Sequence, residues 1–431
     1  MNSKDYWKLR KFQEEAELHK GVKQVDKKLV KAHKQANEYL TREINRLYRR
    51  YLRKTNMSKD EVNKVLNTTV PPNQIIELQQ MSKTVTDKQL KKQVDDYLYG
   101  LSIKSRITRL EDLKAKSYIV SKQVAQVEID NIESFLVDTI QTAYDNSMSQ
   151  NVIRATENII DLPDNLIADI SVKGNERYVE IVDWRKQGVV DKLPINKETG
   201  ADRGYLEIAD WQGKTKRVQL YKDEPISEFK ELSTKYVKST LQKDWKGSNY
   251  SKRIWNDTDK LAERISELLT AENLSGMSER DIQLALEKEF NVSAYCARRL
   301  VRTESNYVYN QANLESWKKF GYEKYQFIAT VDFKTSEVCQ KADRNVYFIA
   351  NAKVGVNFPP LHPNCRSVAT VYFKERAKGK KVMYDPIEKP NFSMNKDDKY
   401  EVWIDYLINK HGNKAVEEAK KDFKSKRYVR R

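Results

Sequence analysis

Apolar side chains in the first part of the chain recur at steps of three and four residues, the spacing of one face of an α-helix. Residues 58–61 read Ser-Lys-Asp-Glu, a capping pattern typical of a helix start, and Pro71 and Pro72 separate that helix from the next. The apolar faces consist of Leu40, Ile44, Leu47, Tyr48 and Tyr51, and of Ala125, Ile129, Ile132, Phe135, Leu136, Ile140 and Ala143. The pattern predicts an extended helical region over residues 1–165.

The period changes to two in residues 178–184 and again in residues 205–211, where apolar and polar side chains alternate. Each run ends in Asp-Trp, and a glycine follows it, at position 188 and at position 213. Both runs therefore predict strands that end in turns. Two similar runs are too few to define a repeat architecture. We predict a β-rich insertion at residues 166–235.

Helical spacing returns after the insertion, with apolar faces in residues 261–269 and 282–290. Residues 278–281 form a second capping pattern, and residues 291–293 predict the start of a further helix. Strand-like runs follow at residues 325–332 and 368–373. We predict a compact α+β domain at residues 236–375 and a basic tail at residues 376–431. The fold class is then α+β, mostly α, with a long helical N-terminal region.

Composition adds a strong basic excess, with 79 Lys and Arg against 62 Asp and Glu and a formal net charge of +17. This excess favours a polyanionic partner such as double-stranded DNA, contacted through its phosphates without reading its sequence. A generic basic composition is the alternative, and cations at a helix end also complement the helix dipole. The candidate DNA contacts are Arg46, Arg49, Arg50, Arg53, Lys426, Arg427, Arg430 and Arg431.

Several functional classes are disfavoured by what the sequence lacks. No stretch approaches the roughly 18 apolar residues needed to cross a bilayer, so we expect no membrane partner. The three cysteines form no disulfide framework, which indicates synthesis in a reducing cytoplasm. Only 13 glycines occur, and no phosphate-binding loop, Ser-His-Asp order or paired-carboxylate pattern is visible. The sequence therefore gives no positive case for catalysis.

Cys339, His362 and Cys365 are the best candidate ligand set in a chain with only three cysteines and four histidines. Thiolate sulfur and imidazole nitrogen suit zinc, which prefers a tetrahedral site. A fourth ligand is needed, and Asp332, seven residues before Cys339, is the first candidate. Zinc is the one cofactor that the sequence suggests.

Two interpretations need no metal, and we favour the first of them over a zinc site. In the first, Pro363 and Asn364 form a turn and Cys365 is a small buried hydrophobe, so that no cofactor is bound. In the second, Cys339 is a nucleophile and His362 its base, although no oxyanion hole or helix N-terminus is evident to support that chemistry.

Arg302, Thr303 and Glu304 lie within a predicted helix and are followed by several asparagines. A functional interpretation is a catalytic Glu304 positioned by Arg302. The alternative is an internal ion pair and hydrogen-bond network that fastens this helix to residues 330–370. We favour the alternative, because a carboxylate and a guanidinium held together need no substrate to explain them.

Taken in order, these segments resemble the C-terminal domain of phage minor head proteins, the head-morphogenesis family similar to phage Mu protein F. The matching segments are residues 251–255, 276–278, 299–304, 310–312 and 329–332, then Cys339, and finally residues 359–366, which read Pro-Pro-Leu-His-Pro-Asn-Cys-Arg. The motif positions include Arg302, Thr303, Glu304, Pro363, Asn364 and Arg366. Family members often carry a second cysteine after this arginine, where this chain has Ser367. If the family's cysteines and histidine hold a metal, this chain lacks one possible ligand.

The resemblance implies a non-enzymatic minor head protein of a tailed bacteriophage, present in few copies per particle and active in procapsid assembly at the portal vertex. The implied partners are the portal protein, the major capsid or scaffold proteins, and packaged DNA. The implied location is the interior of the virion head, after assembly in the host cytoplasm. Two alternatives are a metal-dependent nuclease or transferase carried in residues 250–373, and a scaffold-like assembly factor that is absent from the mature particle.

Overall fold

The chain folds into two compact units, each assembled from segments that lie far apart in the sequence. A helical unit comprises residues 20–137 and 241–304, and a mixed unit comprises residues 1–19, 138–240 and 305–431. The computed structural model describes residues 3–52, 57–104, 106–159, 166–174, 176–183, 185, 188–194, 206–209, 215–218, 229–372, 380–389, 391–395 and 398–429. The predicted fold class, α+β and mostly α, is confirmed.

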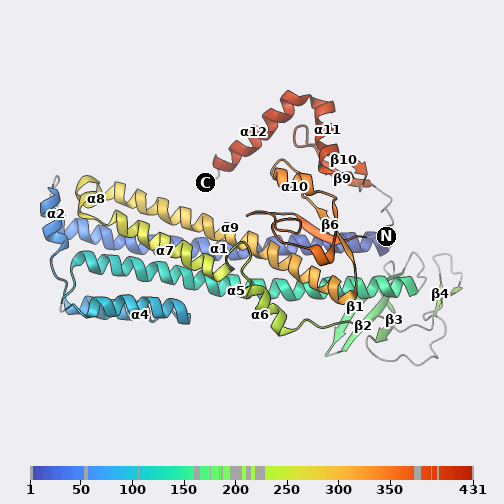
Figure 1. Cartoon of the computed structure of the whole chain (residues 1–431), viewed down its shortest axis with the longest axis horizontal. Coiled ribbons are helices and arrows are strands. Elements are labelled where there is room, and N and C mark those ends of the chain that lie inside the picture. Colours follow the sequence, from blue (N-terminus) through green and yellow to red (C-terminus); the bar gives the residue numbers. More distant parts are fainter. Residues whose placement is uncertain are drawn as a thin grey trace. The chain divides into compact units, whose positions relative to one another are not determined.

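Long helices running side by side form the helical unit (Figure 1). They are parts of α1 (Ser3–Tyr51), α5 (Arg109–Ile159) and α9 (Glu279–Phe320), together with α7 (Tyr250–Leu268). The shorter helices are α2 (Lys59–Leu66), α3 (Pro72–Ser82), α4 (Lys88–Ser102) and α8 (Ala271–Gly276). The hydroxyl of Tyr48 donates to the carbonyls of Leu274 and Met277, at 3.2 and 3.1 Å, which ties α1 to the end of α8.

The two predicted apolar faces are buried. Leu40 and Ile44 on α1 are each 1 % exposed, and Ile132 on α5 is fully buried. Tyr51 is the exception, because it is 42 % exposed and its ring lies 3.7 Å from the guanidinium carbon of Arg109. The spacing of three and four residues thus located the core of the helical unit correctly.

The predicted helix starts are confirmed, and one predicted restart is wrong. Ser58 caps α2 through a reciprocal capping box, α3 begins at Pro72, and the side chain of Ser278 accepts from the backbone of Asp281 at the start of α9. Helix α9 then continues without a break through residues 291–293. No glycine or proline interrupts it, and Ser293 turns inward to bond the ring of His33 at 3.0 Å.

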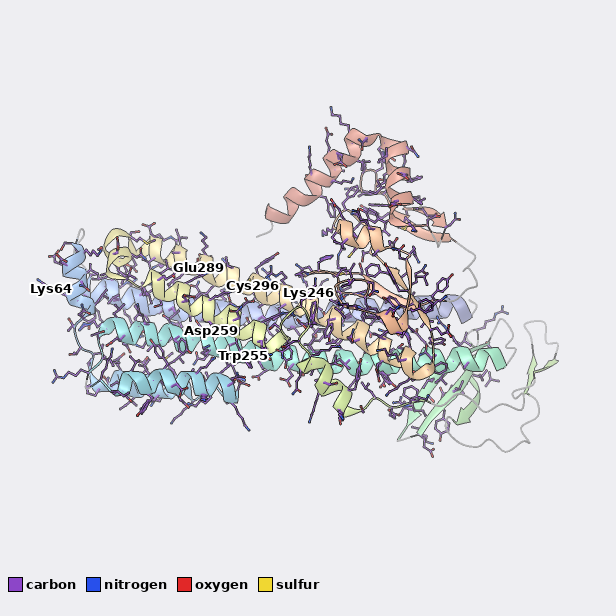
Figure 2. The ribbon with its side chains drawn as sticks, viewed as in Figure 1. Lys64, Lys246, Trp255, Asp259, Glu289 and Cys296 are labelled. Carbon is purple, nitrogen blue, oxygen red and sulfur yellow. The ribbon has the colours of Figure 1, made fainter. Side chains whose placement is uncertain are left out.

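Two lysines are buried inside the helical unit, although lysine is rarely buried without partners. Lys122 is fully buried and bonds Asp259, which lies on α7 (Figure 2), and the side-chain oxygen of Gln93 at 2.6 Å. The Lys116 ammonium lies 2.9 Å from an oxygen of Glu43 and also contacts α3 and α5 carboxylates. These partners offset the cost of removing the charges from water.

The predicted insertion contains β structure, as expected. Strands β1 (Leu166–Lys173), β2 (Glu176–Asp183) and β3 (Gly188–Pro194) form an antiparallel sheet in that order. A separate hairpin pairs β4 (Leu206–Ala209) with β5 (Thr215–Val218). The flanking residues 184, 205, 210 and 211 of the two predicted runs lie outside the described residues. Helix α6 (Thr234–Gln242) follows.

A second antiparallel sheet, ordered β7-β6-β8, carries the predicted C-terminal strands. Its central strand is β6 (Lys324–Ile328), flanked by β7 (Val346–Phe348) and β8 (Val368–Val371). Tyr325 and Phe327 on β6 are fully buried. The connection from β6 to β7 contains helix α10 (Glu337–Ala342), and a 3-10 turn, η1 (Ile349–Asn351), follows β7.

The segment predicted as a basic tail contains folded elements. Hairpin β9 (Lys380–Tyr384) and β10 (Asn391–Asn395) precedes α11 (Tyr400–His411) and α12 (Asn413–Val429). Trp403 and Leu407 on α11 are 1 % and 0 % exposed, and the Trp403 ring packs 5.3 Å from that of Phe333. High charge density therefore did not prevent this segment from burying an apolar face.

Among the helices that the structure describes, none combines the length and the apolar character that a bilayer span requires.

Candidate functional site

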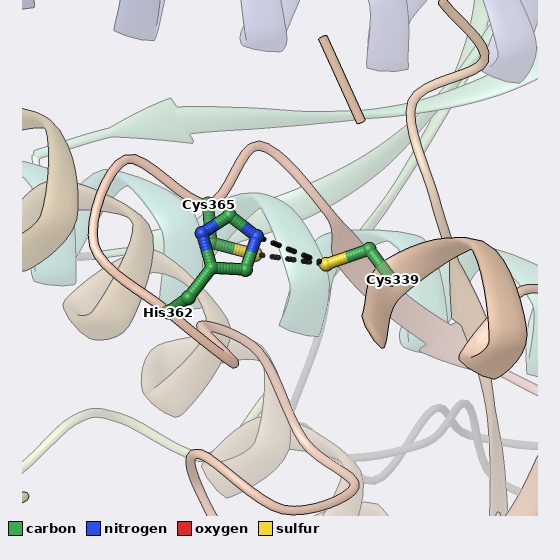
Figure 3. A group of neighbouring side chains, drawn as sticks. All are labelled: Cys339, His362 and Cys365. Carbon is green, nitrogen blue, oxygen red and sulfur yellow. Dashed lines mark hydrogen bonds between the residues drawn. The ribbon is translucent and has the colours of Figure 1, made fainter. Parts of the chain in front are cut away.

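The candidate site lies in the mixed unit, where α10 meets the loop of residues 359–366. Helix α10 carries Cys339, and His362 and Cys365 project from the loop toward it (Figure 3). Cys339 Sγ lies 3.3 Å from Nε2 of His362 and 3.7 Å from Sγ of Cys365. One ligand atom from each of the three residues lies within 4.8 Å of the others. The structure therefore brings the predicted cysteine and histidine set together.

A tight turn shapes the loop. The backbone N–H of Cys365 donates to the carbonyl of His362 at 3.1 Å, and Asn364 adopts a φ of 60°. Asparagine tolerates this left-handed conformation better than most residues do. A turn at Pro363 and Asn364 is thus present, and Cys365 is only 2 % exposed. The turn and the buried cysteine are compatible with the gathered ligand set, because they are what aims Cys365 at Cys339.

The imidazole of His362 has a defined orientation. Its Nδ1 lies 2.8 Å from the carbonyl oxygen of Pro363, which can only accept, so Nδ1 carries the proton. In the neutral ring, Nε2 then presents a lone pair toward Cys339 and toward the hydroxyl of Ser336 at 2.7 Å. A backbone bond of this kind is how proteins fix the tautomer of a metal-binding histidine.

The two thiols interact directly and are not joined by a disulfide. The hydrogen bond between the two sulfurs lowers the pKa of Cys365, and the same bond together with burial raises the pKa of Cys339. A thiol with a raised pKa is a poor nucleophile, so the geometry gives no support to Cys339 acting as a nucleophile with His362 as its base.

Asp332 does not join the ligand set, contrary to its candidacy as the fourth ligand. Both of its carboxylate oxygens accept from the guanidinium of Arg366, each at 2.6 Å. Burial alone would raise the pKa of Asp332, but the bonds and charge of Arg366 keep that pKa below its usual value. A bidentate pair of this kind is strong and directional. The ion pair of Asp332 and Arg366 therefore stabilises the loop and does not complete a metal site.

A small cavity of about 10 Å³ adjoins the three ligand residues. Its lining is mostly polar, with several hydroxyl groups and an amide facing it. The lining residues are Thr330, Lys334, Thr335, Ser336, Cys339, His362, Asn364, Arg366 and Ser367. The volume matches about one water molecule, and polar partners are within reach.

The Arg302 and Glu304 pair expected from the sequence does not form. Glu304 is 2 % exposed, forms an ion pair with Arg253, and accepts from Nε1 of Trp245 at 3.0 Å. Arg302 instead pairs with Asp26 at 3.0 Å. Side chains two positions apart on a helix point in different directions, so those of Arg302 and Glu304 do not meet. The carboxylate that looked catalytic is held in an internal ion pair of the helical unit.

The asparagines that follow on α9 do fasten the helix to the loop region, as the favoured alternative proposed. Asn306 donates to the carbonyl of Ser367 at 2.9 Å, and the backbone of Ala369 donates to Asn310 at 2.9 Å. Thr303 has a different role, because its hydroxyl donates to the helix carbonyl of Arg299 at 2.6 Å. The attachment of α9 to the loop region thus depends on Asn306 and Asn310 rather than on Arg302 and Glu304.

The structure locates only part of the predicted DNA-contact set. Arg46, Arg49 and Arg50 are exposed on the last turns of α1, and Arg46 pairs with Glu43 one turn earlier. Lys426 and Arg427 lie on α12, but their side chains are outside the described part of the chain. Arg53, Arg430 and Arg431 lie outside the described residues altogether.

Sequence reasoning missed a second group in the mixed unit, made of Asp385, Glu388 and His411. Asp385 is fully buried and lies 2.8 Å from Nε2 of His411 and 3.1 Å from the ammonium of Lys410. Lys410 also lies 2.7 Å from Glu388. Because the ammonium already supplies positive charge, this group fastens the end of α11 to the β9–β10 turn. Only the adjacent Lys410 and His411 at the end of a helix could have indicated this group from the sequence.

Comparison with known proteins gives one family match. Residues 263–370 match the family described as Phage Mu protein F like protein. The match includes Glu304, Cys339 and the loop of residues 359–366, and it ends within β8. The resemblance seen in the sequence is therefore confirmed for this segment. No curated protein matches the chain, and no solved structure matches it.

Proposed function

We propose, from the premise that residues 263–370 belong to the Phage Mu protein F-like family, that this protein acts in procapsid assembly at the portal vertex of a tailed bacteriophage. A role related to the phage head follows from the family itself. The portal vertex and the assembly step are the finer proposal. The family match is the single observation that carries it.

Features of the structure support a binding and assembly role over catalysis. Two carboxylates of the motif segments that could serve as general bases are held by arginines: the buried Glu304 by Arg253, and the partly exposed Asp332 by Arg366. The asparagines of α9 are likewise used for fastening the loop. In each unit these polar groups are used to hold the fold together.

Co-sedimentation with the purified portal protein of the same phage tests the assembly proposal. The account predicts that the full chain sediments with portal rings and stays in the supernatant with the major capsid protein alone. A chain that fails to bind portal rings at micromolar concentration contradicts the portal assignment.

We also propose that the protein contacts packaged DNA through phosphates. The net charge of +17 and the exposed guanidinium groups of Arg46, Arg49 and Arg50 support this. Each phosphate contact releases counterions, so affinity falls with salt by a slope of about 0.9 per contact on a logarithmic scale. Such binding is independent of sequence.

Replacing Arg46, Arg49 and Arg50 with glutamine tests this proposal in a salt-titrated DNA-binding assay. If all three contact phosphates, the slope becomes shallower by about 2.7. The control replaces Lys83, Lys88 and Lys92, which are exposed near α4, with glutamine and changes the net charge equally. Equal slopes for both triple variants, or no binding by the parent protein, contradict a role for these arginines.

A metal-dependent nuclease or transferase in residues 250–373 is the competing function. Incubation of the purified chain with plasmid DNA and divalent ions separates the two. The account predicts intact plasmid. Cleavage that disappears in Glu304→Ala or His362→Ala would overturn the structural assignment.

A further inference from the structure

We propose that Cys339, His362 and Cys365 bind one zinc ion, with water as the fourth ligand, and that this ion joins α10 to the loop of residues 359–366. The inference is independent of portal and DNA binding. It concerns only the mixed unit, where all three residues lie.

Two of the three spacings among the ligand atoms match a tetrahedral zinc site, and the third lies within 4.8 Å. Bond lengths of about 2.3 Å to sulfur and 2.0 Å to nitrogen place two sulfurs about 3.8 Å apart, and a sulfur and a nitrogen about 3.5 Å apart. The observed distances are 3.7 Å between the two sulfurs and 3.3 Å from Cys339 Sγ to His362 Nε2. Figure 3 shows the three side chains converging in this way. Little rearrangement is therefore needed to accept an ion.

The surroundings of the ligands favour the same assignment. The bond from His362 Nδ1 to the carbonyl of Pro363 leaves Nε2 as the free ligand atom. Two thiolates and a neutral imidazole around Zn²⁺ give a neutral group, which suits cysteines that are 1 % and 2 % exposed.

The fourth position is explained by the adjoining cavity. Three protein ligands leave one corner of a tetrahedron open, and in zinc sites with three protein ligands a water occupies that corner. The cavity of about 10 Å³ beside the ligands has room for about one water molecule. The hydroxyl of Ser336, now 2.7 Å from His362 Nε2, can turn to hold that water. Asp332 is not required, because Arg366 occupies it.

A disulfide is the competing state of the same two sulfurs. The sulfurs lie 3.7 Å apart, well beyond the roughly 2.05 Å of a disulfide bond. Closing that bond would remove two electrons and two protons and so needs an oxidant. Zinc binding instead displaces the thiol protons and leaves the sulfurs reduced.

The test measures metal content by mass spectrometry of the full chain, purified without chelators from zinc-supplemented cells. We expect one zinc per chain, lost in Cys339→Ser and Cys365→Ser. The matched control is Cys296→Ser, because Cys296 lies on α9 in the helical unit (Figure 2) and should leave the zinc content unchanged. Equal zinc in Cys339→Ser and in the parent protein overturns the proposal.

A second measurement on the unaltered protein removes any dependence on how the variants fold. Replacement of zinc by cobalt should give the visible absorption and sulfur-to-metal charge-transfer bands of a tetrahedral thiolate site. Removal of the metal by a chelator should make two further thiols reactive toward a disulfide reagent. A metal-free protein with all three thiols already reactive, or an intact mass two daltons low from a disulfide, overturns the proposal.

Discussion

At the scale of single residues, the buried charges are held by partners that are distant in the sequence. Glu304 pairs with Arg253, 51 residues before it, and the helical unit encloses both. The guanidinium carbon of Arg253 also lies 4.5 Å from the Trp245 ring. Removing one member of such a pair leaves the other buried without compensation, which costs more than the pair itself contributes.

Arg253→Ala should therefore destabilise the protein strongly. The expected loss is about 3–5 kcal/mol in the free energy of unfolding, because Glu304 is left buried. Lys252→Ala is the matched control: the side chains of Lys252 and its partner Asp244 are 50 % and 43 % exposed, so that pair should contribute about 1 kcal/mol or less. Urea denaturation of both variants measures the difference. Equal losses would show that Glu304 does not depend on Arg253.

A buried carboxyl in the helical unit makes stability depend on pH. Glu128 is 2 % exposed, and burial raises its pKa well above the usual value, while burial lowers the pKa of its neighbour His33 to about 4. His33 Nδ1 donates to the carbonyl of Leu29 at 2.9 Å, so Nε2, 3.4 Å from Glu128, can accept. Both shifts favour a neutral carboxyl facing a neutral imidazole over an ion pair.

Glu128→Gln should remove one component of this pH dependence. A carboxyl whose pKa is higher in the folded state contributes fully below its unfolded pKa near 4.5, and that contribution declines as the pH rises toward the folded pKa. The stability of the glutamine variant relative to the parent should therefore increase above pH 4.5, by at most about 1.4 kcal/mol per pH unit.

Denaturation at several pH values between 4 and 8 measures this difference. Glu272→Gln is the control, because the Glu272 side chain is 77 % exposed and should give a flat difference. A flat difference for Glu128→Gln as well would mean that Glu128 is ionised in the folded protein.

Residue roles were predictable only where the residue type itself is rare. Two of the three cysteines and one of the four histidines fall within residues 339–365, and the structure gathers them. The partner of Glu304 was not predictable, because the sequence contains many arginines and only the packing of the helices determines which one lies beside Glu304. Lys122 likewise reads as a surface residue, although it is fully buried.

At the scale of elements, helix starts and apolar faces were well encoded. The capping residues Ser58 and Ser278 fix the starts of α2 and α9 locally, so no tertiary information was needed. The false restart at residues 291–293 arose because polar residues there resemble a cap. Their actual role depends on His33, which is distant in sequence and bonds Ser293.

Close helix packing predicts opposite effects for two glycine substitutions. A Cβ at Gly21 on α1 would lie 2.6 Å from a ring atom of Phe135 on α5, whereas a Cβ at Gly100 on α4 would meet nothing within 4 Å. Gly100→Ala should stabilise the protein by about 0.5–1 kcal/mol through helix propensity.

In Gly21→Ala the clash with Phe135 should offset the gain in helix propensity, so the variant should be neutral or less stable than the parent. Thermal denaturation of the two variants measures the contrast. An equal rise in melting temperature for both would show that α1 and α5 are not packed as closely as the structure has them.

At the scale of the whole molecule, the two units could not be read from the order of elements. Each unit is assembled from discontinuous segments, and α1, α5 and α9 each contribute residues to both. The domain boundaries predicted from the sequence, at residues 165, 235 and 375, lie where the spacing of apolar residues changes between helix-like and strand-like. They do not follow which segments pack together, because that depends on contacts between residues hundreds of positions apart.

We propose that this chain, whose residues 263–370 match the Phage Mu protein F like family, is a component of the phage head at the portal vertex. Quantitative mass spectrometry of purified procapsids and DNA-filled heads tests it most directly. We expect a few copies of the protein in each procapsid and in each DNA-filled head. When heads are disrupted, the protein should be released together with the portal. Presence in procapsids alone would identify a scaffold-like factor instead, and absence from both kinds of particle would contradict the account.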